Sequence, residues 1–239
     1  MKITSVNNDL IKETAKLLKG KYRDESGLFI LEGKKCIEEA LQSGLEIVHL
    51  FSTEGFEELP QRIEVTEAVL SKISDAKTAP KAVAVAKQVN HKWSENYKKV
   101  VLLEGIKDAG NLGTILRTAA AFGIDAIILY GETVDLYNPK TVRSAVGNLW
   151  KVPVIKTNDL SIFNEYERIA TLPKGDNVIN LKDYTPSEKA VIMFGSEADG
   201  LSEELKNFAT KNVTIEMASD VESLNLSVSA AVVMYKISQ

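Results

Sequence analysis

Residues 191–237 read VIMFGSEADGLSEELKNFATKNVTIEMASDVESLNLSVSAAVVMYKI. The stretch begins with a continuous apolar run, Val191–Phe194, which predicts a buried strand that breaks at Gly195. A second strand is expected at Val213–Met217. The final part predicts an amphipathic helix, because apolar side chains recur on one helical face at Leu226, Ala230, Val233 and Ile237. We therefore expect two strands and a helix that packs on their sheet.

The chain upstream of this stretch alternates between strand and helix patterns. Val100–Leu103 predicts a strand, and after a glycine-rich loop a helix is expected over 114–122, capped by Gly123. A strand at Ala126–Tyr130 completes a β-α-β unit, in which the strands should be parallel. Further strands are expected at 152–155 and 169–172, and helices at 141–146 and 162–168. This half of the chain therefore predicts an α/β fold with a largely parallel sheet.

Residues 1–92 carry a separate α/β pattern. Strands are expected at 27–31, 45–51, 64–66 and 83–89, and helices around 10–18, 34–42 and 67–74. The polar stretch 93–99 lacks periodic apolar residues and lies between the two patterns. We predict two domains, 1–92 and 100–239, joined by a linker at 93–99.

Composition narrows the function classes. The chain has 239 residues, of which 44% are hydrophobic, and no apolar run approaches the roughly 18 residues that span a bilayer. A cytoplasmic protein without a membrane segment is therefore expected. Cys36 is the only cysteine, which rules out an internal disulfide or a cysteine-based zinc cluster. His49 and His91 are isolated, so we expect no metal site.

The charge distribution is uneven. A net charge of -4 argues against a nucleic-acid partner, because phosphate contacts require concentrated positive charge. The first 23 residues nevertheless contain six lysines and arginines against Asp9 and Glu13, and Lys34 and Lys35 follow soon after. This basic end is compatible with a solvated helix face or with a phosphate-binding surface.

Three motifs resemble those of a known family. They are Leu103–Ala119, which reads LEGIKDAGNLGTILRTA, then G-S-E-x-x-G-L at Gly195–Leu201 and S-L-N-L-S at Ser223–Ser227. In this order they resemble the motifs of the SpoU family, S-adenosylmethionine-dependent RNA ribose 2'-O-methyltransferases of the SPOUT class. The resemblance implies a SPOUT domain with a C-terminal trefoil knot, a homodimer formed through that domain, and S-adenosyl-L-methionine as the cofactor.

The resemblance also extends to the N-terminal domain. The order of its elements, with the stretches 21–33 and 73–85, looks like the L30e-like substrate-binding domain of many SpoU proteins. That domain implies an RNA partner, most readily 23S ribosomal RNA. The predicted RNA contacts on phosphates are Lys16, Lys19, Lys21, Arg23, Lys34, Lys35, Lys140 and Arg143.

The family pattern assigns catalytic roles to Asn111, Arg117, Glu197, Ser223 and Asn225. Arg117 projects away from the sheet by helical spacing, and as a permanently charged group it suits electrostatic activation of a hydroxyl. Asn111 is expected to orient the ribose or the arginine, and Glu197 to hold the loop or the arginine in place. Without the resemblance, Asn225 would be read as a helix N-cap and Glu197 and Ser223 as loop residues.

The same comparison implies a cofactor site formed by Thr171, Gly195, Gly200, Ile215 and Leu224. One departure from the family is Glu216, which stands where relatives commonly have proline, and this puts the rigidity of the loop in doubt. A dinucleotide site is disfavoured, because the loop Gly110–Gly113 lacks the third glycine of that fingerprint. The alternatives kept open are a tRNA 2'-O-methyltransferase and a catalytically silent RNA-binding protein of the same fold.

Overall fold

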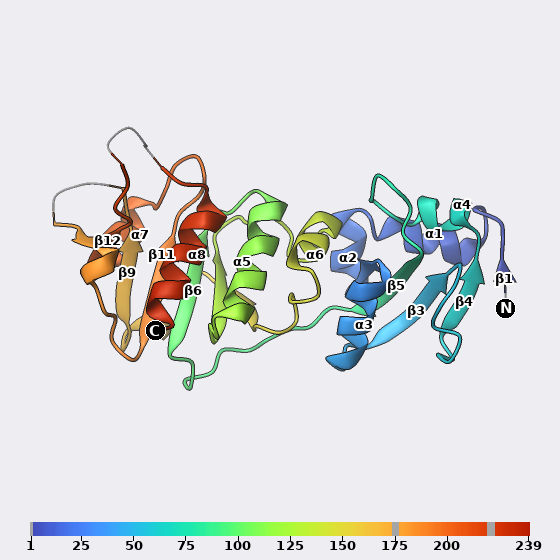
Figure 1. Ribbon diagram of the computed structural model, residues 1–239, viewed down its shortest axis with the longest axis horizontal. Coiled ribbons are helices and arrows are strands. Elements are labelled where there is room, and N and C mark those ends of the chain that lie inside the picture. The colour runs from blue at the N-terminus through green and yellow to red at the C-terminus, as the bar shows by residue number, and fades with distance from the viewer. Residues whose placement is uncertain (1, 174–176, 219–222) are drawn as a thin grey trace. The chain divides into compact units, whose positions relative to one another are not determined.

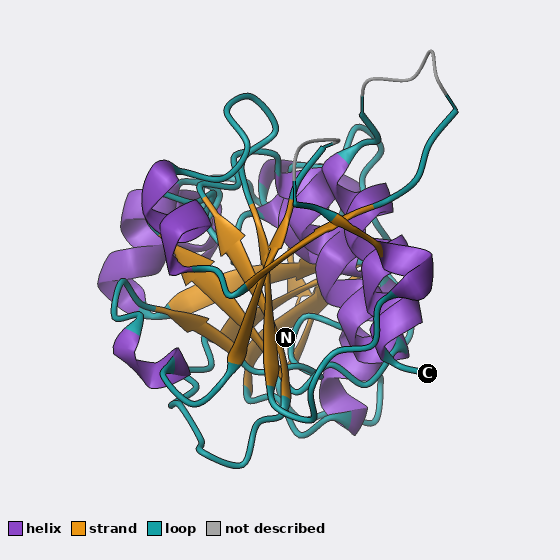
Figure 2. Cartoon of the chain, turned by 90° about the vertical axis from the view of Figure 1, so that its left-hand side faces the viewer, coloured by secondary structure: helices purple, strands orange, loops and turns teal. Residues whose placement is uncertain are grey.

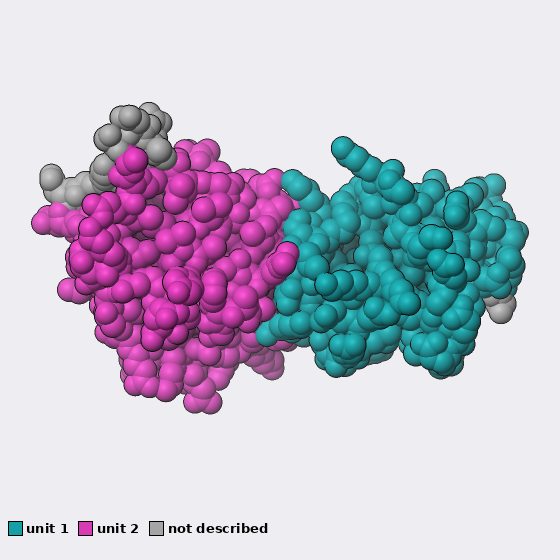
Figure 3. Space-filling view, viewed as in Figure 1, with its two compact units in different colours: residues 1–89, 135–151 teal, residues 90–134, 152–239 magenta. Residues whose placement is uncertain are grey.

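The structure, a computed structural model, describes residues 2–173, 177–218 and 223–239. The chain divides into two compact units, coloured separately in Figure 3. Unit 1 contains residues 1–89 and 135–151, and unit 2 contains residues 90–134 and 152–239.

Within the described residues, unit 2 contains a sheet of seven strands in the order β10-β12-β9-β11-β6-β7-β8, with every neighbouring pair parallel (Figure 1). The strands fan out as the sheet twists, which is visible in Figure 2. The strands of this sheet are β6 (Lys99–Glu104), β7 (Ala126–Tyr130), β8 (Val154–Lys156), β9 (Glu167–Thr171), β10 (Ile179–Asn180), β11 (Ala190–Phe194) and β12 (Lys211–Thr214). The predicted parallel α/β sheet is thereby confirmed.

The centre of this sheet is buried on both faces. β6 and β11 pair in register from Ala190 with Lys99 to Phe194 with Leu103, and side chains such as Val101 and Ile192 are fully buried. Continuous apolar runs are what a parallel sheet between helices requires, because neither face meets water.

Two helices of unit 2, α5 and α8, begin directly after residues whose side chains cap the helix N-terminus. α5 (Ala109–Ala121) starts after Asp108, whose Oδ1 accepts from the backbone N–H of Asn111 at 2.8 Å. α8 (Leu226–Ile237) starts after Asn225, whose side chain accepts from the N–H groups of Ser227 and Val228. Such caps satisfy N–H groups that lack partners in the first turn. α5 and α8 lie side by side on the sheet (Figure 1), and α7 (Glu203–Phe208) completes the unit's α-helices among the described residues.

The described part of unit 1 holds a five-stranded sheet in the order β1-β4-β3-β5-β2. Its strands are β1 (Lys2–Ile3), β2 (Leu28–Glu32), β3 (Ile47–Ser52), β4 (Arg62–Val65) and β5 (Ala82–Lys87). Its helices are α1 (Asp9–Lys16), α2 (Gly20–Ser26), α3 (Lys34–Gln42), α4 (Glu67–Lys72) and α6 (Pro139–Ala145).

The segment 135–151 packs in unit 1, although its place in the sequence lies between two strands of unit 2. Arg23 is 2% exposed, and its Nε and Nη2 donate to Asp135 Oδ2 at 2.8 and 2.5 Å. Arg143 pairs with Glu32 and also with Asp75, at 3.0 Å.

A hydrogen bond and a further ion pair secure the same segment. The Tyr137 hydroxyl donates to the Val89 carbonyl at 2.9 Å, and Lys151 lies 2.8 Å from Glu39. All these partners are distant in sequence, so no local pattern could have indicated this packing.

The expectations for residues 162–168 and 93–99 differ from the structure. Residues 162–168 do not form the predicted helix, because a short 3-10 turn (Ser161–Phe163) is followed by β9 from Glu167. The expected linker 93–99 belongs to unit 2, where Trp93 packs edge-on against Phe163 at 5.3 Å between ring centroids. The rings of Trp93 and Tyr97 are partly buried and pack against the core of unit 2.

The Arg23 pair gives a stability prediction. Replacing Arg23 with alanine leaves Asp135 without its partner and removes the bond to the Leu17 carbonyl, so we expect a loss of about 2–4 kcal/mol in the free energy of unfolding. The matched control is Lys21→Ala, which removes an exposed pair with Glu25 and should change stability by less than about 0.5 kcal/mol. Urea denaturation followed by circular dichroism measures both. Equal effects of the two variants would contradict this account.

Candidate active site

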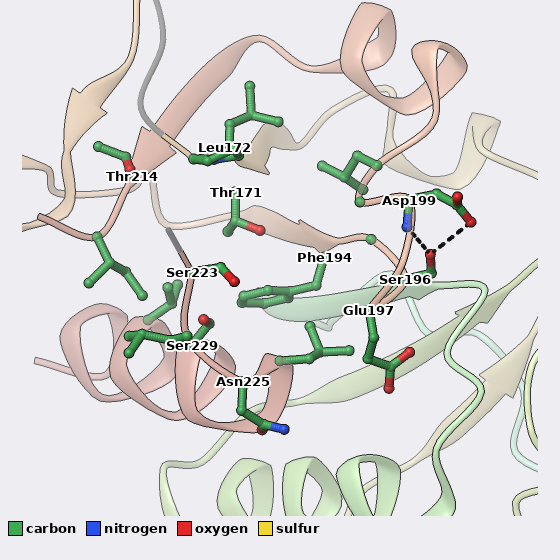
Figure 4. A pocket seen from close by; sticks show the side chains of 18 of the residues that line it. Thr171, Leu172, Phe194, Ser196, Glu197, Asp199, Thr214, Ser223, Asn225 and Ser229 are labelled. Atoms are coloured by element: carbon green, nitrogen blue, oxygen red, sulfur yellow. Dashed lines mark hydrogen bonds between the residues drawn. The ribbon is translucent and has the colours of Figure 1, made fainter. Parts of the chain in front are cut away.

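A cavity of about 610 Å³ lies at the carboxyl ends of the unit 2 strands. Its walls come from the end of β9, the loop after β11, the segment after β12 and the start of α8 (Figure 4). Ligands of open parallel α/β sheets bind outside the carboxyl ends of the strands. The volume lies within the range of about 300–1,000 Å³ typical of small-molecule sites.

Gly195 and Gly200 shape the loop that forms one wall. The two backbone bonds between Ser196 and Gly200, each 3.1 Å, close the loop on itself, and Gly200 adopts a φ of +67°. A Cβ on Gly195 would lie 1.9 Å from the Gly200 carbonyl carbon and 2.1 Å from the Leu201 nitrogen. Only glycine fits at position 195, because backbone atoms occupy the side-chain space.

The residues expected to hold the cofactor come together around this cavity. Thr171, Gly195, Gly200, Ile215 and Leu224 all line it. The Thr171 hydroxyl donates to the Met193 carbonyl at 2.8 Å, so it ties the end of β9 to β11.

Thr214 is a lining residue that sequence reasoning missed. Its hydroxyl oxygen is buried and has no hydrogen-bond partner among the described residues. A buried hydroxyl without a partner is costly, and a polar ligand in the cavity would satisfy it. The available signal was its position at the end of β12, next to Ile215.

Glu216, which follows Ile215, holds the loop after β12 through two side-chain hydrogen bonds. Its Oε2 accepts from Asn180 Nδ2 at 2.9 Å and from Lys182 Nζ at 2.5 Å. These contacts tie the segment after β12 to residues 180 and 182, at the position where the resemblance led us to expect proline.

Three predicted catalytic residues form a chain of hydrogen bonds beside the cavity. Asn225 Nδ2 donates to Asn111 Oδ1 at 3.1 Å, and Asn111 Nδ2 donates to Glu197 Oε1 at 2.8 Å. The orientation follows from the helix cap: because Asn225 Oδ1 accepts the α8 N–H groups, its amide nitrogen must face Asn111. Figure 4 shows Glu197 and Asn225 pointing to the same side, toward α5.

The other two predicted catalytic residues lie outside this chain. Ser223 lines the cavity and is exposed. Arg117 is exposed on α5 and makes no hydrogen bond or ion pair with another residue in the described ranges. Its six-residue separation from Asn111 corresponds to about 9 Å along the helix axis. The structure therefore brings Asn111, Glu197 and Asn225 together but does not join Arg117 to them.

The predicted RNA contacts fall into two groups. Lys16, Lys21 and Lys34 are exposed and pair with glutamates three or four residues away, and such pairs are weak enough to exchange for phosphate. Lys19, Lys35 and Lys140 are exposed too.

Arg23 and Arg143 have a different environment. Arg23 is buried and both arginines are engaged by carboxylates in unit 1, as described above. Their guanidinium groups hold the segment 135–151, so we reassign them from RNA binding to this structural role.

The described residues give little support for a cysteine nucleophile, a histidine base or a metal site. Burial raises the pKa of the Cys36 thiol to about 11, so at neutral pH it carries its proton and is a poor nucleophile. Burial lowers the pKa of both His49 and His91. In the described ranges no group of three or more His, Cys, Asp or Glu side chains is arranged to hold a metal ion. The same ranges contain no helix with the length and apolar character needed to cross a membrane.

Comparisons with known proteins agree with this geometry. Residues 98–235 match the SpoU rRNA Methylase family, and residues 8–84 match the MRM3-like substrate binding domain. The chain is 31% identical over 243 residues to 23S rRNA (guanosine(2553)-2'-O)-methyltransferase RlmP of Bacillus subtilis, covering 98% of this chain and 97% of that protein.

Solved structures show the same relationship. An AdoMet-bound rRNA methyltransferase from Sinorhizobium meliloti superposes with a TM-score of 0.87 at 28% identity, covering 99% of this chain and 96% of that one. An RNA 2'-O ribose methyltransferase superposes with a TM-score of 0.84 at 30% identity, covering 99% and 97%. The resemblance drawn from the three motifs is confirmed by the match over residues 98–235, and the expectation of an N-terminal substrate-binding domain by the match over residues 8–84. The chain belongs to the SpoU family of methylases.

Proposed function

We propose that the protein is an S-adenosylmethionine-dependent RNA ribose 2'-O-methyltransferase that acts on 23S ribosomal RNA. The observation that carries the proposal is the hydrogen-bonded chain Asn225-Asn111-Glu197 at the edge of a cavity whose wall has no room for a side chain at Gly195. The Bacillus subtilis relative, whose name gives this reaction on 23S rRNA, covers nearly the whole chain.

The cavity fits the cofactor in size and chemistry. Gly195 and Gly200 allow a ligand to approach the backbone, and Ile215 and Leu224 offer apolar walls. The Thr214 hydroxyl has no hydrogen-bond partner in the part of the chain that the structure describes. When bound, S-adenosyl-L-methionine supplies a methyl group activated by a sulfonium charge.

The polar residues would align the acceptor. A ribose hydroxyl is a weak nucleophile, so the site must hold it in line with the methyl carbon and stabilise the oxyanion as the proton leaves. Asn111 and Asn225 are fixed by their mutual hydrogen bond and can orient the ribose, with Glu197 holding Asn111. Ser223 would donate to the substrate or brace the loop.

Arg117 would act through its charge. Its exposed guanidinium has no partner among the described residues, so it is available for a substrate phosphate or a developing oxyanion. Because an arginine stays protonated at neutral pH, we assign it electrostatic activation rather than the role of a base.

We further propose that residues 1–92 bind the RNA and that the enzyme works in the cytoplasm. In this proposal residues 93–99, although they pack in unit 2, are the covalent connection to the methyltransferase domain 100–239, whose segment 135–151 packs in unit 1. The exposed Lys16, Lys19, Lys21, Lys34, Lys35 and Lys140 would contact phosphates. A tRNA substrate is the second candidate, and the intact hydrogen-bonded chain counts against a silent RNA binder.

We propose a trefoil knot at the C-terminus and a homodimer formed through α8. The knot is supported by the convergence of three separate C-terminal segments on one cavity. The dimer is supported by an apolar stripe on α8, where Val228, Val232 and Tyr235 are 48%, 40% and 56% exposed at helical spacing.

Cofactor binding depends on position 195. Gly195→Ala places a methyl group inside the backbone of Gly200 and Leu201, so the wall must shift and affinity for S-adenosyl-L-methionine should fall at least about tenfold. Isothermal titration calorimetry measures the change. Gly20→Ala is the matched control, because a Cβ there meets only ordinary contacts in unit 1. Native affinity in Gly195→Ala would contradict the proposed cofactor site.

Arg117→Ala should reduce methyl transfer about 100-fold or more, as is typical when a group that stabilises developing charge is removed. Cofactor affinity should stay unchanged, since Arg117 does not line the cavity. Transfer of labelled methyl to ribosomal RNA gives the rate, with Lys156→Ala, an exposed cation on β8, as the control. Full activity in Arg117→Ala would exclude the assigned role.

The dimer prediction concerns the α8 stripe. Val232→Lys introduces a charge into an interface that would exclude water, so the variant should become monomeric. Ile179→Lys changes an apolar residue of similar exposure, 37%, in strand β10 rather than in the α8 stripe and should stay dimeric. Light scattering after size-exclusion chromatography measures both masses. A monomeric wild-type protein would overturn the proposed dimer.

A further inference from the structure

Ser227 lies in the first turn of α8, beside the hydrogen-bonded chain of the proposed active site. The residue is 7% exposed, and its hydroxyl donates to Asn225 Oδ1 at 2.7 Å. The backbone N–H of Ser227 donates to the same oxygen at 2.9 Å, whereas the Val228 nitrogen is 3.4 Å away, near the limit of a hydrogen bond. Both short bonds to Asn225 Oδ1 therefore come from Ser227.

These two bonds use the acceptor capacity of Asn225 Oδ1. A carboxamide oxygen has two lone pairs, and the Ser227 hydroxyl occupies the one that the backbone N–H leaves open. Asn225 is exposed, so without the hydroxyl this lone pair would accept from water and the side chain would be freer to turn. The backbone N–H sets which end of the amide faces the helix, and the hydroxyl keeps it there.

Glu197 sets the direction of the chain from its other end. A carboxylate only accepts, so Asn111 presents its Nδ2 to Glu197 and its Oδ1 to Asn225 Nδ2. If the Asn225 amide turned over, its oxygen would face the oxygen of Asn111 and the two acceptors would repel. Each amide has a second N–H that donates to no other side chain or carbonyl in the described ranges. These two N–H groups remain for a substrate oxygen.

We propose that Ser227 is a positioning residue for methyl transfer, whose hydroxyl fixes the Asn225 amide and thereby directs the free N–H groups of Asn225 and Asn111 toward the reacting ribose oxygen. This inference rests on the proposed methyltransferase function. Donors that are oriented in advance stabilise developing negative charge without reorganising during the reaction. The Ser227 hydroxyl acts through Asn225 and does not itself line the cofactor cavity.

The assignment distinguishes two serines of one motif. Ser223 was the serine expected to take part in catalysis, but it is exposed and makes no hydrogen bond with Asn111, Glu197 or Asn225 among the described residues. Ser227 had no predicted role, because by spacing it is an ordinary residue of the first helical turn. Its burial and its bond back to the capping side chain give it a connection to the site that Ser223 lacks.

Threonine and valine at position 227 test the hydroxyl, because the two side chains are similar in shape and only threonine keeps the donor. Ser227→Thr should retain most of the kcat for methyl transfer to ribosomal RNA, and Ser227→Val should lose about five- to tenfold, the effect of one hydrogen bond. Affinity for S-adenosyl-L-methionine, measured by calorimetry, should be the same in both. Equal kcat values in the two variants would overturn the inference.

Two further alanine variants guard against a misfolded pair. Ser227→Ala adds no atom to the buried site, so it should fold and show the same loss of kcat as valine. Ser238→Ala is the matched control, because the Ser238 hydroxyl bonds only the Tyr235 carbonyl at the other end of α8. Wild-type kcat in Ser227→Ala would contradict the positioning role.

Asn225→Asp shows whether the hydroxyl acts through Asn225. Aspartate also caps helix N-termini, so α8 should keep its start, but the variant has no side-chain N–H for Asn111. In this background Ser227→Ala should change kcat by less than about twofold, since the chain is already broken. A further loss of the full size would place the action of Ser227 elsewhere and overturn the inference.

The side-chain amide protons give a readout that needs no substrate. In nitrogen–proton NMR spectra, the Nδ2 protons of Asn225 and Asn111 should exchange with water several-fold faster in Ser227→Ala than in the wild-type protein. Unchanged exchange would show that the hydroxyl does not hold the chain. Absence of methyl transfer by the wild-type protein would instead defeat the proposed function, and the exchange measurement would still decide the positioning.

Discussion

The close approach of Gly195 to the backbone of Gly200 and Leu201 is the constraint on which the site depends. A Cβ at Gly195 would overlap these atoms at about 2 Å, so the chain can return on itself there only as glycine. This return makes one wall of the cavity and presents Glu197 to α5. A backbone collision cannot be relieved by a rotamer change, which makes the constraint strict.

The N-terminal ends of α5 and α8 supply the polar side chains beside this wall. Asp108 caps α5 and Asn225 caps α8, and both caps are needed because the first turn of a helix leaves N–H groups unpaired. The cap on α8 leaves only the amide nitrogen of Asn225 free to meet Asn111, and Asn111 then faces Glu197. An ordinary capping interaction thus fixes the direction of the whole chain of hydrogen bonds.

The sequence predicted the parts of the fold that local pattern determines. The buried strands β6, β7 and β11 appear as apolar runs, and α8 follows its spacing of apolar residues. α5 begins at Ala109 rather than at the predicted residue 114, because the Asp108 cap outweighs the low helix propensity of Gly110 and Gly113.

The remaining features depend on partners far along the chain. Arg23 and Arg143 looked like RNA contacts, but carboxylates over 100 residues away engage them in unit 1. Thr214 lines the cavity, and its buried hydroxyl has no partner among the described residues, which depends on tertiary packing that a local pattern does not show. The motifs predicted that Asn111, Glu197 and Asn225 would meet, whereas nothing in them predicted the hydrogen bonds that orient the three side chains.

In the proposed function, these converging segments direct a methyl group onto an RNA ribose. Mapping ribose methylation across total RNA from cells with and without the protein tests it most directly. We predict that one methylated ribose of the large-subunit RNA disappears when the protein is absent and returns with the wild-type chain. An identical methylation map in both cells, from a protein that still binds S-adenosyl-L-methionine, would contradict the account.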